Sequence, residues 1–235
     1  MLGRHWQGLG SPGLGRNEVN LDWAWIQREL PMIGSLLVEH IVLAVLPVLI
    51  AFIVSLPLGF LVSKMRRATN VVLAFLGVIY SIPSLALFVM MPLILGTKIL
   101  NPVNIVVALA IYSTALLVRS VVDGLRSVPP AVKQSASAVG YGWPRRLFRV
   151  ELPLAMPVIF AGLRVVTVSN IALVSVAVLV GSGALGKLFD LGFSSFFYTP
   201  IIVALILMLA LSLIFDALIL VIQRGTLPWL RGRPA

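Results

Sequence analysis

The chain has 235 residues, of which 60% are hydrophobic and only 11% are charged, and its mean hydropathy is +1.06. No soluble core of this size requires so much apolar surface, so the composition excludes a soluble protein and predicts an integral membrane protein. The lack of cysteine excludes disulfides, thiolate metal sites and a cysteine nucleophile.

The N-terminal segment, residues 1–32, is expected to form a tail outside the hydrocarbon layer. Residues 1–20 are Gly-rich and polar and lack the apolar core of a secretory signal, so the first span is expected to serve as an uncleaved insertion signal. Residues 21–30 mix Trp23 and Trp25 with charged side chains, which predicts a short interfacial helix that Pro31 ends. An extended tail that merely carries two tryptophans is the alternative.

Five apolar runs follow, and a helix of about 20 residues suffices to cross a hydrocarbon layer of ~30 Å. Because the runs are continuously apolar rather than alternating, they favour helices over barrel strands. The sequence therefore predicts an all-α, polytopic membrane domain over 33–224, with a short tail over 225–235. The five predicted spans are 36–62, 71–95, 103–119, 157–180 and 199–222. Kinks are expected at prolines in the first two spans, namely Pro47, Pro57, Pro83 and Pro92.

The net charge of +10 is distributed unevenly between the two sides of the predicted spans. Basic residues gather in the first loop, in the third loop and after the last span: Lys64, Arg66, Arg67, Arg126, Lys133, Arg145, Arg146, Arg149, Arg224, Arg231 and Arg233. By the positive-inside rule the N-terminus lies outside, and the third loop and the C-terminus are cytoplasmic. Membrane topology therefore explains the net positive charge, and nucleic-acid binding is not needed to explain it.

The third loop, about 120–156, is a long basic island in an otherwise apolar chain. It predicts a helix from Val121 to Ser127, a turn at Pro129 and Pro130, and a second helix from Ala131 that ends between Gly140 and Pro144. The second helix carries small side chains, so it is slim enough to enter a groove on another protein. A solvated basic hairpin is the alternative.

The spacing within this loop resembles the EAA loop of the membrane subunits of ATP-binding-cassette (ABC) importers. That pattern reads Glu-Ala-Ala, three residues, Gly, nine residues, Ile, one residue, Leu-Pro. Here Ala136, Gly140, Leu152 and Pro153 match, whereas Val150 replaces Ile, Ser135 replaces the first Ala and Gln134 replaces Glu.

Further segments are similar to the permeases for glycine betaine, choline, carnitine and related osmoprotectants, and the similarity covers residues 33 to 224. They are 82–87, 150–158, 161–164 and 180–186. The resemblance implies a type I ABC importer permease fold in a bacterial cytoplasmic membrane. It also implies half of a translocation pathway for an osmoprotectant such as glycine betaine, choline, carnitine or proline betaine.

The same resemblance implies the partners of the chain. They are a cytoplasmic ABC ATPase, a second permease subunit that is identical or paralogous, an extracytoplasmic solute-binding protein and the membrane lipids. The residues implied to couple the permease to the ATPase are Gln134, Ser135, Ala136, Gly140, Leu152 and Pro153. The chain itself is expected to have no catalytic residue, metal or cofactor.

Three other functions are weighed against this one. An ABC permease for another small solute, such as an amino acid, fits the same loop. An ion-driven secondary carrier is disfavoured because no internal repeat is evident, and a membrane enzyme because no nucleophile or metal constellation is present. The stretch 181–187 fits the start of a phosphate-binding loop, but Leu188 stands where Ser or Thr would bind magnesium and no strand in a cytoplasmic domain precedes it.

Two ionisable residues, Arg164 and Asp216, fall within predicted spans, where a charge costs ~2.5–3.5 kcal/mol on insertion scales. Each lies about 10 Å from the cytoplasmic end of its span, counted at 1.5 Å per residue. They are predicted to pair within or between subunits, in a structural rather than a substrate-binding role.

Polar side chains in the second and fourth spans are candidates to line a water-filled passage. They are Ser81, Ser84, Ser169, Asn170 and Ser175. The alternative is that they bridge helices through hydrogen bonds, which contribute roughly 0.6 kcal/mol each within membranes.

Overall fold

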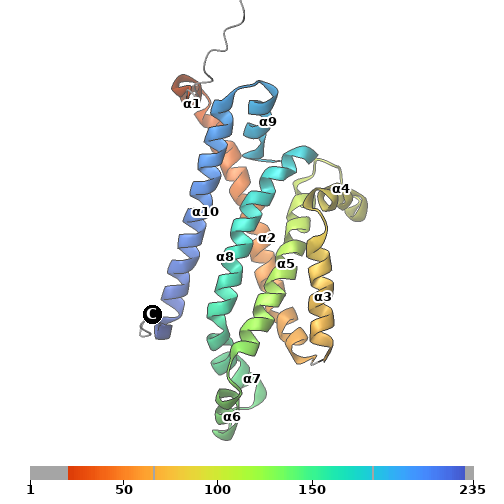
Figure 1. Cartoon of the computed structure of the whole chain (residues 1–235), viewed down its shortest axis with the longest axis vertical. Coiled ribbons are helices and arrows are strands. Elements are labelled where there is room, and N and C mark those ends of the chain that lie inside the picture. Colours follow the sequence, from red (N-terminus) through yellow and green to blue (C-terminus); the bar gives the residue numbers. More distant parts are fainter. Residues whose placement is uncertain (1–20, 66, 182, 231–235) are drawn as a thin grey trace, which may run out of the picture.

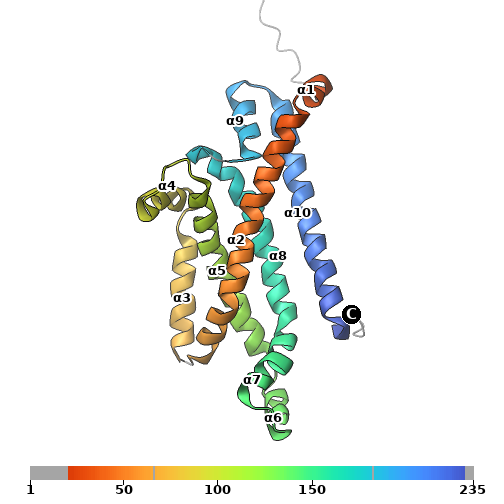
Figure 2. The same ribbon diagram turned by 180° about the vertical axis from the view of Figure 1, so that it is seen from behind.

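The computed structural model describes residues 21–65, 67–181 and 183–230, so residues 1–20 of the predicted N-terminal tail and the last five residues lie outside it. Within the described residues all regular structure is helical. The chain folds into a bundle of long helices that run along one axis (Figures 1 and 2). Four of them are long and apolar enough to span a membrane: α2 (Leu30–Lys64), α5 (Pro102–Ser127), α8 (Leu152–Val176) with its flanking turns, and α10 (Tyr198–Thr226).

The predicted second span is broken into α3 (Arg67–Ser81) and α4 (Ser84–Leu95), which meet at an angle of 94°. The predicted span over 71–95 is therefore sharply bent at Pro83, where a kink is expected, and the described helices give five spans when the bent pair counts as one. The break falls at Pro83, which lacks an N–H and disfavours helical backbone at Ile82. The Tyr112 hydroxyl of α5 donates a hydrogen bond to the Ile82 carbonyl that the break leaves free.

The short helix predicted before the first span is present as α1 (Trp23–Arg28). Asp22 caps it, because its carboxylate accepts a hydrogen bond from the Trp25 amide at 2.9 Å. Trp25 is buried against the Phe197 ring, whereas Trp23 is 66% exposed. The prediction that Pro31 ends this helix is wrong. Pro31 lies in the first turn of α2, where a backbone N–H has no partner within the helix and its loss costs nothing.

Helix α5 lies at the centre of the bundle and packs against α2, α3, α4 and α8. The largest cluster of buried side chains joins α5 to α2, α4 and α8 through residues such as Leu43 of α2, Phe88 of α4, Leu109 of α5 and Ile171 of α8. Close packing of this kind stabilises membrane helices, because lipid tails are as apolar as the side chains themselves.

The segment between α5 and α8 forms one end of the molecule, which we call the α6–α7 end. It contains α6 (Pro130–Ala138), α7 (Trp143–Arg146) and a π-helical turn (Leu147–Glu151). The helix predicted over 121–127 is not separate, because α5 continues unbroken to Ser127. Helices α1, α4 and α9 (Gly186–Ser194) lie toward the opposite end (Figure 1).

Candidate functional site

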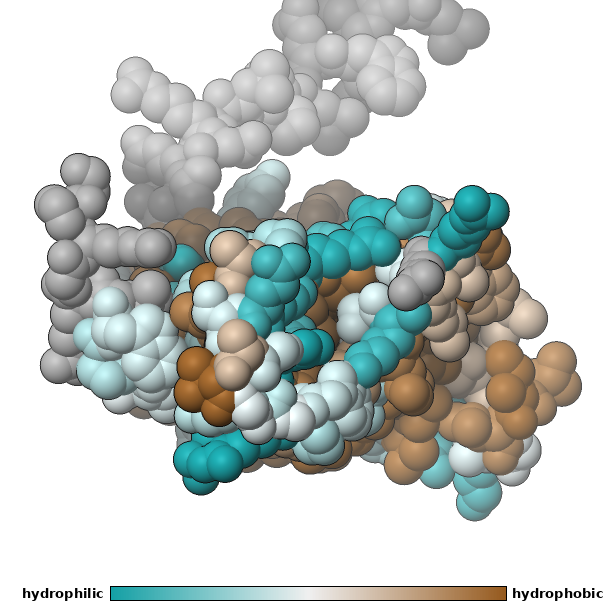
Figure 3. Space-filling model, turned by 90° about the horizontal axis from the view of Figure 1, so that it is seen from below, coloured by the Kyte–Doolittle hydropathy of each residue, from teal (hydrophilic) through white to brown (hydrophobic). Residues whose placement is uncertain are grey.

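Helix α6 projects from the bundle, and none of its nine residues is buried. Gln134 and Ser135 are exposed, and Val139, which follows the helix, is 79% exposed. Hydrophilic side chains gather on this end of the molecule (Figure 3). The short helix α6, with its small side chains, is therefore accessible for contact with another protein.

The end of α6 explains the spacing between Ala136 and Gly140. The Tyr141 amide donates to the Ala136 carbonyl at 3.0 Å, and the Gly140 amide donates to the Ser137 carbonyl at 3.0 Å. These two bonds form a Schellman motif, which requires a left-handed residue four positions after Ala136. Gly140 supplies it with φ of +87°.

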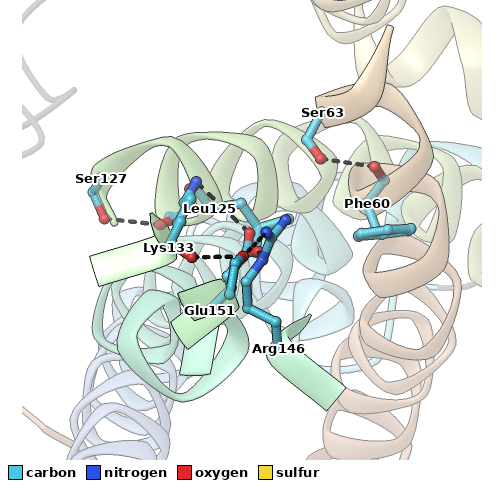
Figure 4. Close-up of polar contacts among 9 residues, drawn as sticks. Phe60, Ser63, Leu125, Ser127, Lys133, Arg146 and Glu151 are labelled. Carbon is cyan, nitrogen blue, oxygen red and sulfur yellow. Dashed lines mark hydrogen bonds and ion pairs between the residues drawn. The ribbon is translucent and has the colours of Figure 1, made fainter. Parts of the chain in front are cut away.

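Glu151, which the sequence analysis did not single out, joins α6 and α7 to the start of α8 (Figure 4). It is 9% exposed. Its Oε1 accepts a hydrogen bond from Arg146 Nε at 2.7 Å, and its Oε2 lies 3.6 Å from Lys133 Nζ. A signal was available, because Glu151 is the sole acidic residue between Asp123 and Asp190 in a segment rich in Lys and Arg.

The two cations extend this contact to neighbouring elements. Lys133 Nζ donates to the Leu125 carbonyl in the last turn of α5 at 2.9 Å, where helix carbonyls lack partners. Arg146 donates to the Ser137 hydroxyl at 2.8 Å. Helix α6 is thus braced against α5, α7 and α8, and we call these four residues, Lys133, Ser137, Arg146 and Glu151, the Glu151 brace.

Leu152 and Pro153 begin α8 directly after the π-helical turn. Pro153 has no N–H and its ring crowds the carbonyl four residues earlier, so a regular α-helix is unfavourable there. The wider π turn relieves this crowding. Leu152 packs with Val121 and Leu125 of α5, which fixes the base of the segment on the bundle.

A second contact joins α7 to the end of α2. The Lys64 ammonium lies 3.7 Å from the centre of the Trp143 ring and 5.0 Å from that of Phe60, a cation–π arrangement. The two rings are 5.1 Å apart.

The six predicted coupling residues divide into two groups. Gln134 and Ser135 face outward, and the local structure depends on Ala136, Gly140, Leu152 and Pro153.

Arg164 of α8 and Asp216 of α10 lie together in one subunit. Arg164 Nε donates to Asp216 Oδ1 at 2.6 Å, and Arg164 Nη2 donates to Oδ2 at 2.8 Å. This is the two-pronged geometry in which guanidinium and carboxylate bind most strongly. Of the two arrangements considered, pairing within one chain is the one observed.

The five candidate path residues lie on α3, α4 and α8. Asn170 is 2% exposed and donates hydrogen bonds to Ser113 Oγ at 3.0 Å and to the Ala44 carbonyl at 3.4 Å. It bridges α8 to α5 and α2, which is the alternative role considered for these residues, and lining of a passage by Asn170 stays a prediction. Lining by Ser81, Ser84, Ser169 and Ser175 stays a prediction.

Within the described part of the chain, no group of three or more His, Asp or Glu side chains is placed to hold a metal ion. The fold and the site together define a multi-pass helical membrane protein with a braced, exposed helix at one end.

Comparison with known proteins gives the family. Residues 51–227 match the family of binding-protein-dependent transport system inner membrane components. The chain belongs to this family.

Two relatives match most of the chain. An osmoprotectant import permease protein, OsmW of Salmonella typhimurium, is 33% identical over 190 residues, which cover 80% of this chain and 88% of the relative. The glycine betaine/carnitine/choline transport system permease protein OpuCD of Bacillus subtilis is 36% identical over 166 residues, 71% of each chain.

Solved structures confirm the predicted type I ABC importer permease fold. A chain of the MetNI methionine ABC transporter superposes with a TM-score of 0.72 at 22% identity, over 80% of this chain and 93% of that one. A chain of an amino acid ABC transporter superposes with a TM-score of 0.70 at 19% identity, over 88% and 99%.

Proposed function

We propose that this chain is the membrane-spanning permease subunit of an ABC importer and forms half of the translocation pathway for an osmoprotectant such as glycine betaine, choline, carnitine or proline betaine. The observation that carries the coupling role is the exposed helix α6, which the Glu151 brace holds rigidly on the bundle. The solute class is supported by the two relatives, whose names specify osmoprotectants.

In this proposal α6 seats in a groove of a cytoplasmic ABC ATPase. Movement of the ATPase displaces α6 as a rigid body, and the brace passes the force to α5 and α8, because Lys133 contacts α5 and Glu151 directly precedes α8. ATP switches the pathway only if it binds the two conformations with different affinity. Hydrolysis belongs to the ATPase partner, and this chain is non-catalytic.

The remaining partners are a second permease subunit, identical or paralogous, and an extracytoplasmic solute-binding protein. We place the α6–α7 end and the C-terminus in the cytoplasm, and the N-terminus outside a bacterial cytoplasmic membrane. Support comes from the cations near the α6–α7 end, which the positive-inside rule assigns to the cytoplasm. They include Lys64, Arg67, Arg126, Lys133, Arg145, Arg146 and Arg149.

The coupling role is tested by co-purification of ABC ATPase subunits with the tagged chain in detergent. The wild type is compared with the double variant Ala136→Glu, Gly140→Val, and membrane insertion is scored for both. We expect an ATPase to co-purify with the wild type and to be lost from the inserted variant. Absence of any ATPase from both, in detergent that preserves known ABC complexes, would contradict the proposal.

The solute class is tested by uptake in cells that express the transporter. Radiolabelled glycine betaine, choline, carnitine and methionine are supplied separately, with and without collapse of the ion gradients. Uptake of a quaternary ammonium solute that persists without the gradients supports the proposal. Uptake of methionine alone would indicate an amino-acid permease, and uptake that stops with the gradients would indicate a secondary carrier.

A further inference from the structure

Two adjoining cavities lie where the end of α2, the end of α5 and the α7 turn meet. One, of about 380 Å³, is a groove lined by apolar side chains that include Leu56, Val121 and Leu147. The other, of about 170 Å³, is a crevice lined mainly by charged and polar groups. Phe60, Leu125 and Trp143 line both, so the apolar groove runs into the charged crevice.

The crevice carries more positive than negative charge. Lys64, Arg126, Lys133 and Arg146 line it, and Glu151 is the one acidic residue among its lining side chains. Glu151 is already engaged by Lys133 and Arg146. Among the described residues neither Lys64 nor Arg126 forms an ion pair. Lys64 lies over aromatic rings, and Arg126 donates a hydrogen bond to the Asn70 amide oxygen at 3.4 Å. An anion in the crevice would balance these two positive charges.

The groove has the opposite character. Its walls are hydrocarbon and aromatic rings, and its rim includes Trp143, 42% exposed, and Phe148, 67% exposed. It therefore opens to the surroundings of the bundle and offers apolar surface at the level where the cations begin. Tryptophan is enriched at this level in membrane proteins, between hydrocarbon and head groups.

We propose that the groove and the crevice together bind one anionic phospholipid, with its phosphate in the crevice and an acyl chain along the groove. A free phosphate would use the crevice alone, and a neutral lipid or detergent would use the groove alone. Basic pockets between membrane helices attract anionic head groups in this way. The bound lipid would touch α2, α5 and α7 at once and so tie the Glu151 brace to α2. Binding is a property of this chain and does not depend on its transport role.

The experiment measures tryptophan quenching in the purified chain in detergent, with phosphatidylglycerol whose acyl chains carry bromine. Trp143→Phe identifies the share of the quenching that arises at the groove. We expect the brominated lipid to quench the Trp143 emission. The double variant Lys64→Gln, Arg126→Gln should need about 30-fold more lipid, which is the loss expected from two cations at a membrane surface. With the wild-type chain, brominated phosphatidylcholine should need a similarly higher concentration than brominated phosphatidylglycerol for the same quenching.

A matched control removes the same charge from the same end. Arg67 and Arg149 are exposed and line neither cavity, so Arg67→Gln, Arg149→Gln should quench like the wild type. Arg126→Lys keeps the charge and should also bind, and gel filtration checks folding of each variant.

Three results would overturn the proposal. An equal loss of lipid affinity in the control variant and in the variant Lys64→Gln, Arg126→Gln would show general attraction of the lipid to the basic surface. Equal quenching by the two lipids would show a groove without head-group recognition. Displacement of the brominated lipid by millimolar inorganic phosphate would show a site for free anions.

Discussion

At the level of single residues, the Glu151 carboxylate connects more of the candidate site than any residue of the recognised motif. It lies between two cations from different elements and directly precedes α8, the helix that is proposed to carry the movement of α6 into the bundle. The motif position usually held by Glu is Gln134, which is exposed on α6. The carboxylate that stabilises this segment is therefore 17 residues further along, and it acts inside the subunit instead of at its surface.

Replacement of Glu151 by Gln should weaken the brace. A hydrogen bond to a charged group contributes about 1.5–3 kcal/mol, and the change leaves Lys133 and Arg146 without a countercharge. We expect a lower thermal midpoint in detergent and reduced ATP-driven uptake. Glu29→Gln is the control, because its pair with Arg28 is 70% exposed on the arginine side and such pairs contribute about 0–1 kcal/mol. Equal effects of the two changes would exclude the special role of Glu151.

Gly140 and Gly142 allow a test of backbone conformation without a change in packing. A Cβ at either position meets no atom within 4 Å, but φ is +87° at Gly140 and −60° at Gly142. A side chain in the left-handed region costs about 1–2 kcal/mol, whereas Val adopts the extended conformation of Gly142 readily. Gly140→Val should therefore stay inserted and lose coupled uptake, and Gly142→Val should keep it. Normal uptake in Gly140→Val would refute the role of the Schellman turn.

At the level of helices, polar groups hold α2, α5 and α8 in register. Asn170 bonds to Ser113 and to the Ala44 carbonyl, and the next residue, Ile171, accepts a hydrogen bond at 2.9 Å from His40. Because a carbonyl only accepts, the ring nitrogen Nε2 of His40 must be the donor. Adjacent residues of α8 are thus bound to α2 in both directions, so a polar residue in this span contributes to helix packing.

Helix α10 depends more than the other spans on one polar contact, the pair of Asp216 with Arg164, because only 11% of its most apolar stretch is buried within the chain. Asp216→Asn and Arg164→Gln should each lower the yield of folded protein and its thermal midpoint, since each leaves an unpaired charge within a span. The exchange Arg164→Asp, Asp216→Arg should restore part of the loss. Asp190→Asn, at an exposed position on α9, is the control and should have no effect. Failure of the exchange while each single change is severe would contradict a simple pairing role.

At the level of the whole molecule, long apolar runs were sufficient to predict the helices, because a membrane leaves few other ways to satisfy the backbone. The turn at α6 could also be predicted, since Gly140 and Pro144 act locally. A kink at Pro83 could be predicted as well, but its angle of 94° could not, because Pro83 only permits a bend, whereas a hydrogen bond from Tyr112, 30 residues away, stabilises it. The continuity of α5 with the helix predicted over 121–127 was missed, because its polar last turns are stabilised by Lys133 from the next helix.

The orientation of the molecule can be tested because the chain contains no cysteine, so a single introduced thiol reports one position. Ala138 on α6 and Ser194 on α9 are both exposed, and Figure 1 shows α6 and α9 at opposite ends of the bundle. In intact cells a membrane-impermeant maleimide should label Ser194→Cys, and it should label Ala138→Cys only after the membrane is opened. The reason is the excess of Lys and Arg around α6, which insertion retains in the cytoplasm. The reverse pattern would place α6 outside, beyond the reach of any cytoplasmic ATPase, and would refute the coupling role together with the orientation.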